Sequence, residues 1–227
     1  SFYQSEYGRF YEDAVLDPGE LVAFKPDIVY LHTCYLNVLT QPPAHASETE
    51  MQAYVDGEAA RYREIWQAIK QHSSAQIIQN NFEMPPYSIL GNLDSRSSGG
   101  ATRFFLELNA KLARMAESEP RVLIQDIARL SAQTGLNHWF DWDRYFSYKI
   151  HVTVEANLAM ARSLTGMVRA IYGKSYKVLV LDLDNTLWGG VIGDDGVDKI
   201  QIGRETPVAE AYTCLLYTSD AADDLTR

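Results

Sequence analysis

The chain has 227 residues, and its 20 lysines and arginines against 30 aspartates and glutamates give a formal net charge of −10 at pH 7. Hydrophobic residues make up 46% of the sequence and charged residues 22%, which is typical of a globular chain and excludes a disordered, collagen-like or coiled-coil protein. The acidic balance argues against a nucleic-acid-binding protein, which needs a basic surface, and no apolar run of about 18 or more residues predicts a membrane span.

Strands are predicted where short apolar runs rich in β-branched residues lie between chain breakers, and helices in the longer stretches between these runs. The predicted strands are residues 27–31, 75–79, 121–125 and 177–181, and the predicted helices are residues 48–71, 102–117 and 154–172. Strand and helix alternate throughout. This alternation predicts an α/β fold with a parallel sheet and right-handed crossovers.

The last predicted helix has apolar residues at three- or four-residue steps, which predict one buried stripe. The stripe consists of Val154, Leu158, Ala161, Leu164, Val168 and Ile171. Gly173 follows as the expected end of the helix. We expect a boundary at residues 172–175, with an N-terminal domain over residues 1–173 and the start of a second domain over residues 176–213.

Residues 80–100 are rich in proline, glycine, asparagine and serine, which predicts a long loop after the second strand. Loops beyond the carboxyl ends of parallel strands are where α/β folds bind ligands. A plain surface excursion explains the same composition equally well.

The sharpest chemical signal is the segment from Lys177 to Gly190, in which an apolar strand ends in Asp182 and Asp184. Residues spaced by two along a strand point to the same face, so the two carboxylates are expected to lie close together. Adjacent carboxylates repel each other unless they share a cation or a proton, and Mg²⁺ prefers such oxygen ligands. A carboxylate can also attack phosphorus, so this spacing suits phosphoryl chemistry.

The segment resembles the first motif of the haloacid dehalogenase-like (HAD) superfamily, Asp-x-Asp-x-Thr, which Asp182, Asp184 and Thr186 fill. The resemblance implies that Asp182 is the nucleophile and a Mg²⁺ ligand. It implies that Asp184 is the general acid and base and offers its backbone carbonyl to the metal. Thr186 would hold the strand end and the phosphoryl oxygens.

The wider pattern resembles the FkbH-like branch, subfamily IIIC, of the HAD superfamily. This likeness is carried by residues 182–196, 205–207 and 210–212. It implies the truncated first strand and hairpin of a HAD Rossmann-like domain. Trp188 in the glycine-rich hairpin is expected to line the substrate pocket or, as the alternative, to be a core aromatic beneath the hairpin.

The sequence from Tyr7 to Tyr172 is similar to the N-terminal α/β region of the same branch, notably at residues 24–29, 91–94 and 139–141. That region is related in fold to SGNH hydrolases and to flavodoxin-like parallel sheets. Because the sequence opens in mid-pattern at Ser1, we expect a fragment that lacks an early strand and its serine nucleophile.

Four further residues of this region carry hypotheses. Asp143 and His151 are candidates for the remnant of an SGNH Asp/His pair, although a histidine at a helix start is more often capped or exposed. Asn37 is a candidate oxyanion donor or a plain loop residue. Cys34 is interpreted as a small buried hydrophobe.

Residues 214–227 resemble a translated sequencing adapter, so we expect a non-native tail that has no part in the fold. The HAD resemblance also calls for a later Ser or Thr, a Lys and an acid. All of these would lie beyond Tyr212, so the chain as given is expected to be inactive.

Taken together, these patterns predict Mg²⁺-dependent phosphoryl chemistry in the intact protein. By resemblance, the reaction is either phosphatase action on a phosphorylated small molecule or glyceryl transfer to an acyl carrier protein in polyketide-type biosynthesis. The alternatives are a module that docks a carrier protein or partner enzyme, and an SGNH-like esterase. Two cysteines form no disulfide framework, which favours a reducing, cytoplasmic setting.

Overall fold

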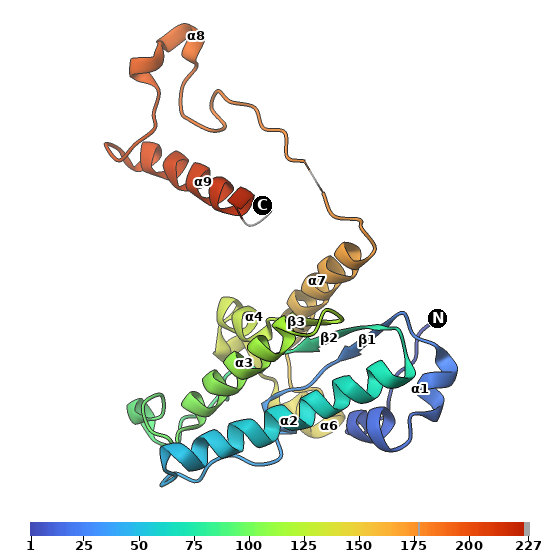
Figure 1. Ribbon diagram of the computed structural model, residues 1–227. Helices are drawn as coiled ribbons and strands as arrows, with labels where there is room; N and C mark the ends of the chain where they lie inside the picture. Colours follow the sequence, from blue (N-terminus) through green and yellow to red (C-terminus); the bar gives the residue numbers. More distant parts are fainter. Residues whose placement is uncertain (177, 225–227) are drawn as a thin grey trace. The chain divides into compact units, whose positions relative to one another are not determined.

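The computed structural model describes residues 1–176 and 178–224, with side chains to Thr218. The chain divides into two compact units, Ser1–Ile171 and Tyr172–Arg227. Each unit is described by itself below (Figure 1). Among the described residues, no helix has both the length and the apolar character that crossing a membrane requires.

A sheet of three parallel strands forms the centre of the first unit. The strands lie in chain order and are β1 (Ile28–Leu31), β2 (Gln76–Asn80) and β3 (Val122–Gln125). Three of the predicted strands and the predicted α/β fold with a parallel sheet are thereby confirmed. Parallel pairing with the order β1-β2-β3 places all three carboxyl ends at one edge of the sheet.

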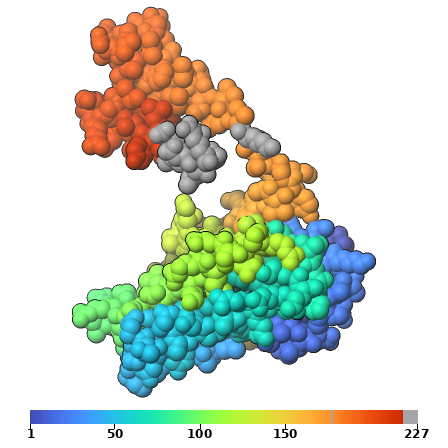
Figure 2. All heavy atoms as spheres, viewed as in Figure 1, coloured from blue at the N-terminus to red at the C-terminus, as the bar shows by residue number. Residues whose placement is uncertain are grey.

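Two long helices make the crossovers between these strands, α2 (Glu48–His72) and α3 (Ala101–Glu117). They match the predicted helices to within a residue. Helix α2 begins with a capping box, in which Ser47 accepts a hydrogen bond from the Glu50 amide and Glu50 accepts one from the Ser47 amide. The two helices lie side by side on one face of the sheet, and their atoms form a continuous surface (Figures 1 and 2).

The main hydrophobic core lies between these helices and alternate residues of the strands. Strand residues that point toward α2 and α3 belong to this core, as the two-residue period of a strand requires. Aromatic rings fill much of the space. The strand contributors include Val29, Leu31, Ile77 and Val122, and the fully buried helix residues include Tyr62, Trp66, Phe104, Phe105 and Leu108.

The opposite face of the sheet meets helix α7 (Val154–Ile171), whose Met160 carbonyl accepts a hydrogen bond from Gln125 in β3. The predicted stripe of this helix is wrong in its first half. Val154 is 64% exposed and Leu158 is 53% exposed, whereas Ala156 and Met160 are the buried residues. Apolar residues lie on more than one side of this helix, so the contact with the sheet, and not the spacing, decides which side is buried.

Shorter elements connect the main ones, and most of them were not predicted. They are η1 (Glu12–Leu16), α1 (Gly19–Phe24), η2 (Tyr35–Asn37), η3 (Gly91–Leu93), α4 (Ile127–Thr134), α5 (Leu136–Trp139) and α6 (Trp142–Tyr148). A second small core, made of Ile127, Trp139, Val152, Ala156 and Met160, joins α4 and α5 to α7. Residues 81–100 contain no α-helix and only the short turn η3, as the predicted loop requires.

The second unit contains α8 (Ile192–Asp195), η4 (Val197–Lys199) and α9 (Pro207–Asp224). The predicted strand at residues 177–181 is wrong over its described part, residues 178–181, and Lys177 lies outside the described residues. Val178, Leu179 and Val180 are 77%, 75% and 86% exposed. A strand forms only where another strand pairs with it, and no strand of the described residues does so here.

Helix α3 starts at a point where the backbone passes unusually close to a buried acid. Asp94 is 2% exposed, and its carboxylate accepts hydrogen bonds from the amides of Thr102 and Leu90. Burial alone would raise the pKa of Asp94, but these hydrogen bonds lower it. A Cβ atom on Gly100 would lie 1.8 Å from the Asp94 carbonyl oxygen, so only glycine fits at this helix start.

Two glycine substitutions therefore have opposite expected effects on stability. Gly100→Ala forces the Asp94 backbone to move and is expected to lower the free energy of unfolding by about 1–3 kcal/mol. Gly57→Ala, at a site in α2 with open space around it, is expected to raise it by about 0.5–1 kcal/mol. Urea unfolding followed by circular dichroism measures both. Equal effects of the two changes would contradict this account of the α3 start.

Candidate functional site

The predicted phosphoryl site lies in the second unit, where Asp182 and Asp184 sit in extended chain before a tight turn. Asp182 is exposed, and its Oδ1 accepts a hydrogen bond from the Leu183 amide, 2.8 Å away. Asp184 is partly buried, and its Oδ1 accepts from the Trp188 indole Nε1, 3.0 Å away, and from the Ile192 amide, 3.2 Å away. Asp184 and Trp188 are thus brought together, while Asp182 remains open to solvent.

A compact turn holds this arrangement. Asn185 has a φ of 55°, in the left-handed region that asparagine tolerates, and its Oδ1 accepts from the Gly190 amide at 2.9 Å. Gly189 and Gln201 form an antiparallel bridge that closes the hairpin. Thr186 is partly buried in the turn, and its amide donates to the Leu183 carbonyl. The turn therefore positions the predicted residues through local hydrogen bonds.

The two carboxylates fit Mg²⁺ in ligand type, since this ion binds carboxylate oxygens and retains several waters. Asp182 is exposed, and one oxygen of Asp184 is left over from the contacts with Trp188 and Ile192. Within residues 1–176 and 178–224, however, the second unit holds no group of three close metal-binding side chains. Asp182 and Asp184 would thus supply only part of a Mg²⁺ ligand set.

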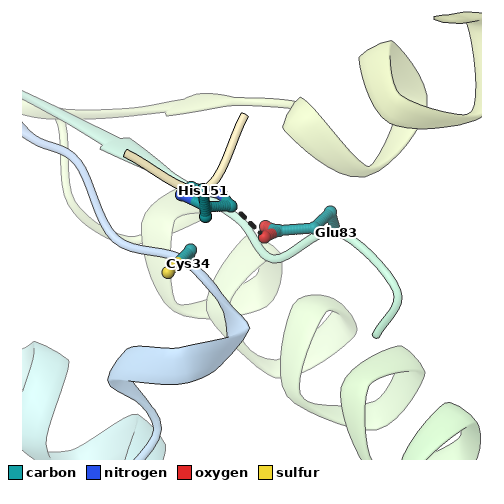
Figure 3. Close-up of side chains that lie close together, drawn as sticks. All are labelled: Cys34, Glu83 and His151. Carbon is teal, nitrogen blue, oxygen red and sulfur yellow. Dashed lines mark ion pairs between the residues drawn. The ribbon is translucent and has the colours of Figure 1, made fainter. Parts of the chain in front are cut away.

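A second constellation, not predicted as such, lies in the first unit and consists of Cys34, Glu83 and His151 (Figure 3). Their sulfur, oxygen and nitrogen atoms all lie within 4.8 Å of one another. Cys34 is 7% exposed, Glu83 0% and His151 6%. Cys34 and Glu83 each follow the end of a strand, β1 and β2, by three residues, so both lie at the edge where α/β folds bind ligands.

The Cys34 segment is held by amide side chains from the neighbouring strand. Asn80, at the end of β2, accepts from the Thr33 amide at 2.7 Å and also donates to the Thr33 carbonyl. Gln79 donates to the Leu31 carbonyl and the Thr33 hydroxyl. These buried bonds dock the residues just before Cys34 against β2.

The segment that carries Glu83 is fixed by α3. The side chain of Asn109 accepts from the Phe82 amide at 2.8 Å and donates to the Phe82 carbonyl at 2.7 Å. The Phe82 ring is fully buried and contacts Tyr62 and Phe105. Glu83 thus follows a residue whose backbone and ring are both anchored.

His151 comes from the short connection between α6 and α7. Its carbonyl accepts from the Asp141 amide at 2.8 Å, and the next residue, Val152, forms an antiparallel bridge with Phe140. The imidazole is stacked on His32, with ring centroids 6.0 Å apart. The ring is therefore oriented by a backbone bridge and by a flanking aromatic surface.

Glu83 has no lysine or arginine within ion-pair distance among the described residues, and its charge partner is His151, with Nε2 to Oε1 at 3.1 Å. Burial by itself lowers the pKa of His151. The Cys34 sulfur and the Glu83 carboxylate raise it, and the net effect is a pKa of about 10. Desolvation of the imidazole and the neighbouring His151 charge lower the pKa of His32, although His32 as a whole residue is exposed.

The buried polar atoms of this group are not saturated. Despite the short ion-pair distance, neither carboxylate oxygen of Glu83 nor Nε2 of His151 makes a hydrogen bond of regular geometry with a described residue. The Cys34 sulfur lies 3.2 Å from Oδ1 of Asn37, which also accepts from the Cys34 amide at 2.8 Å. Buried polar atoms ordinarily have hydrogen-bond partners. Several buried atoms without partners in one place therefore favour a ligand-binding role for this cluster.

These contacts correct the predictions for the first unit. The proposed Asp143/His151 pair is wrong, because Asp143 is exposed in the first turn of α6 and the acid beside His151 is Glu83. His151 is buried, not exposed. Cys34 is buried as predicted but belongs to a polar cluster, and Asn37 contacts it directly.

One signal in the sequence could have found the cluster. Cys34 and Glu83 occupy matching places after two adjacent strands, and chemical residues at matching places of parallel strands meet at one edge. The contribution of His151 follows only from the tertiary fold.

The comparisons with known proteins identify the family of the chain. The family model of the FkbH N-terminal domain matches residues 1–169. The chain is similar, with a TM-score of 0.82 and 25% identity, to a structure described as the N-terminal part of the protein BF1531 from Bacteroides fragilis, containing a phosphatase domain, complexed with Mg. The match covers 99% of this chain and 58% of that one, so the chain spans somewhat more than half of its structural neighbour. A search of curated proteins gave no match. The chain belongs to the family of proteins that carry an FkbH N-terminal domain, as the sequence resemblance predicted.

Proposed function

We propose that the intact protein transfers an acyl group through a thioester on Cys34 and removes phosphate at Asp182 and Asp184. The observation that carries this proposal is the buried group of a thiol, an imidazole and a carboxylate at the carboxyl edge of the sheet. A thiol beside a histidine that an acid orients is the arrangement used for covalent acyl chemistry.

The first step is acylation of the thiol. In the resting group the proton lies on His151, in keeping with the raised pKa of that ring, and the Cys34 sulfur attacks the carbonyl carbon of an activated acid as the thiolate. A C–S bond forms as the bond from the carbonyl carbon to the leaving group breaks. Glu83 stabilises the imidazolium, because the two groups lie 3.1 Å apart.

The second step passes the acyl group to another thiol. His151 gives its proton to the departing leaving group of the first step. The neutral ring then takes the proton of the acceptor thiol, whose sulfur attacks the thioester as the Cys34 sulfur leaves. A free carboxylate is a poor acyl donor, so the chemistry calls for an activated acid such as an acyl phosphate. The family resemblance favours a phosphorylated three-carbon acid as donor and an acyl carrier protein as acceptor. The cytoplasm, where thiols stay reduced, suits this step.

The phosphoryl step belongs to the second unit. Asp182 is exposed and is the side chain able to attack phosphorus, forming an aspartyl-phosphate as the alcohol leaves. Asp184, which contacts Trp188 and Ile192, would give a proton to the leaving alcohol and take one from the water that then hydrolyses the aspartyl-phosphate and releases phosphate. Mg²⁺ held by Asp182 and Asp184 would neutralise charge on the phosphoryl group. The structural neighbour, a phosphatase-domain protein in complex with Mg, supports this assignment.

The SGNH-like esterase hypothesis takes a new form. The first strand of the described sheet is β1, and the thiol of Cys34 lies three residues beyond the carboxyl end of this strand. If water replaced the acceptor thiol, the same group would hydrolyse the acyl donor. The docking-module hypothesis stays a prediction that needs no catalytic residue.

Acylation is tested with the intact protein and an acyl phosphate of a small hydroxy acid. We expect a covalent adduct on Cys34 that hydroxylamine removes, detected by mass spectrometry of tryptic peptides. Cys34→Ser should abolish the adduct, while His45→Gln, at an exposed histidine, should leave it unchanged. Release of free acid without any adduct that responds to Cys34→Ser would contradict the thioester.

The His151 ion pair predicts a loss of stability at alkaline pH. The pKa of His151 is about 10 in the folded chain against 6.5 ordinarily, so folding favours the protonated ring. This contribution is complete below about pH 6.5 and is lost as the pH rises through about 10. One unit of pKa shift corresponds to about 1.4 kcal/mol, so a decline of more than about 1 kcal/mol is expected.

The measurement is urea unfolding of the reduced chain across this pH range. His151→Gln should show a flatter alkaline profile than the unchanged chain. Asp143→Asn, an exposed neighbour on α6, is the matched control and should keep the decline. The same decline in His151→Gln would show that the His151–Glu83 ion pair does not cause the alkaline loss of stability.

The phosphoryl step predicts that Asp182→Asn in the intact protein lowers phosphate release by at least about 10³-fold, because the nucleophile is gone. Asp194→Asn, an exposed acid in the nearby turn, should leave the rate unchanged. Chelation of Mg²⁺ should also stop the reaction. Turnover that survives Asp182→Asn would refute the nucleophile, and turnover in chelator would refute the metal.

A further inference from the structure

We propose that Cys34, Glu83 and His151 also bind a zinc ion, and that the bound ion prevents acylation of Cys34. Zinc binding is independent of the function proposed above, while the blocking of acylation rests on it. The three side chains would supply one thiolate, one imidazole and one carboxylate, which is the mixed ligand set typical of zinc.

The geometry is close to what a zinc ion needs. Tetrahedral zinc, with bonds of about 2.0–2.3 Å, places its ligand atoms roughly 3.5 Å apart. His151 Nε2 and Glu83 Oε1 are 3.1 Å apart, and the Cys34 sulfur completes a group within 4.8 Å. The sulfur has only to turn from Asn37 toward the other two groups. Three protein ligands leave the fourth position open.

The unsatisfied atoms give independent support. Both oxygens of Glu83 and Nε2 of His151 are buried without a regular hydrogen bond to any described residue. A buried carboxylate is costly unless it is paired, hydrogen-bonded or bound to a metal. A metal ion would bind these oxygen and nitrogen atoms, and the Cys34 sulfur, at the same time.

Charge balance favours a divalent ion. A thiolate and a carboxylate carry two negative charges, and a dication with a neutral imidazole brings the buried group to zero. Without a metal, protonated His151 is the charge partner of Glu83, and among the described residues no lysine or arginine lies within ion-pair distance of Glu83. A zinc ion would therefore take the place of the proton on His151. The sulfur ligand selects zinc over Mg²⁺, because Mg²⁺ prefers an all-oxygen shell of the kind that Asp182 and Asp184 offer.

The direct test titrates the metal-free, reduced 227-residue chain with Co²⁺, a spectroscopic substitute for zinc. We expect one equivalent to produce the near-ultraviolet absorption of a cobalt–thiolate bond, and Zn²⁺ to abolish it. Cys34→Ser should remove the band, and Cys214→Ser should retain it. Absence of the band, or a band that depends on Cys214, overturns the proposal.

The other two ligands are tested by affinity. Glu83→Gln and His151→Gln should each weaken zinc binding, measured by competition with a chromogenic chelator, by more than about 10²-fold. His45→Gln, at an exposed histidine, is the matched control and should bind as the unchanged chain does. Unchanged affinity in either ligand variant overturns the three-residue site.

A measurement on the unchanged chain covers the case in which a variant does not fold. Iodoacetamide labelling of both cysteines is followed by mass spectrometry with and without one equivalent of zinc. Zinc should slow the labelling of Cys34 by at least about tenfold and leave Cys214 as the internal reference. Equal labelling of Cys34 in both conditions overturns the proposal.

The blocking of acylation is tested on the intact protein by following the Cys34 adduct with and without zinc. Loss of the adduct on zinc addition, and its return with a chelator, is the expected result. Cobalt–thiolate absorption without any adduct would leave the zinc site standing and refute the proposed acyl transfer. An adduct that forms equally well with zinc bound would refute the blocking.

Discussion

The arrangement of the first unit depends on amide side chains buried at the carboxyl ends of its parallel strands. Gln79 and Asn80 are fully buried and Gln125 is 1% exposed, so each must find hydrogen-bond partners within the protein. They find them in the loop that follows β1, in the Tyr30 hydroxyl and in the Met160 carbonyl of α7. Satisfying these amides therefore fixes the loop that carries Cys34 and holds α7 against the sheet.

The same edge contains an acid whose burial ties distant parts of the chain together. Glu83 follows β2, while its charge partner His151 comes from the connection just before α7. Because no other cation of the described residues lies within ion-pair distance of this buried carboxylate, the docking of that connection is an electrostatic requirement. The candidate site is therefore complete only when the sheet, the loop after β2 and the segment before α7 have all assembled. The positions of Cys34, near the start of the unit, and of His151, near its end, therefore depend on each other through Glu83.

The sequence predicts those features that local chemistry decides. The three strands follow from apolar runs between breakers, and the two long crossover helices follow from the stretches between them. Features decided by packing are not predicted. The side of α7 that faces the sheet carries Met160 rather than Leu158, although both are apolar. The cluster around Cys34 draws on three loops far apart in the chain. The matching places of Cys34 and Glu83 after two strands are visible in the sequence, but the arrival of His151 beside them is decided by tertiary packing alone.

The thioester proposed at Cys34 would give a physical reason for thiol and phosphoryl chemistry to occur in one protein. The thiol group lies in the first unit and the carboxylate pair in the second, so a free intermediate could leave between two reactions. An acyl group bonded to Cys34 cannot diffuse away, and holding one reactant replaces an encounter from solution with an intramolecular step. The burial of Cys34, Glu83 and His151 also limits access of water, which would otherwise hydrolyse the thioester. Under the proposed function, the acyl group would therefore be released by a thiol that reaches into the site, and a thiol on a long, flexible arm, such as that of a carrier protein, would meet this requirement.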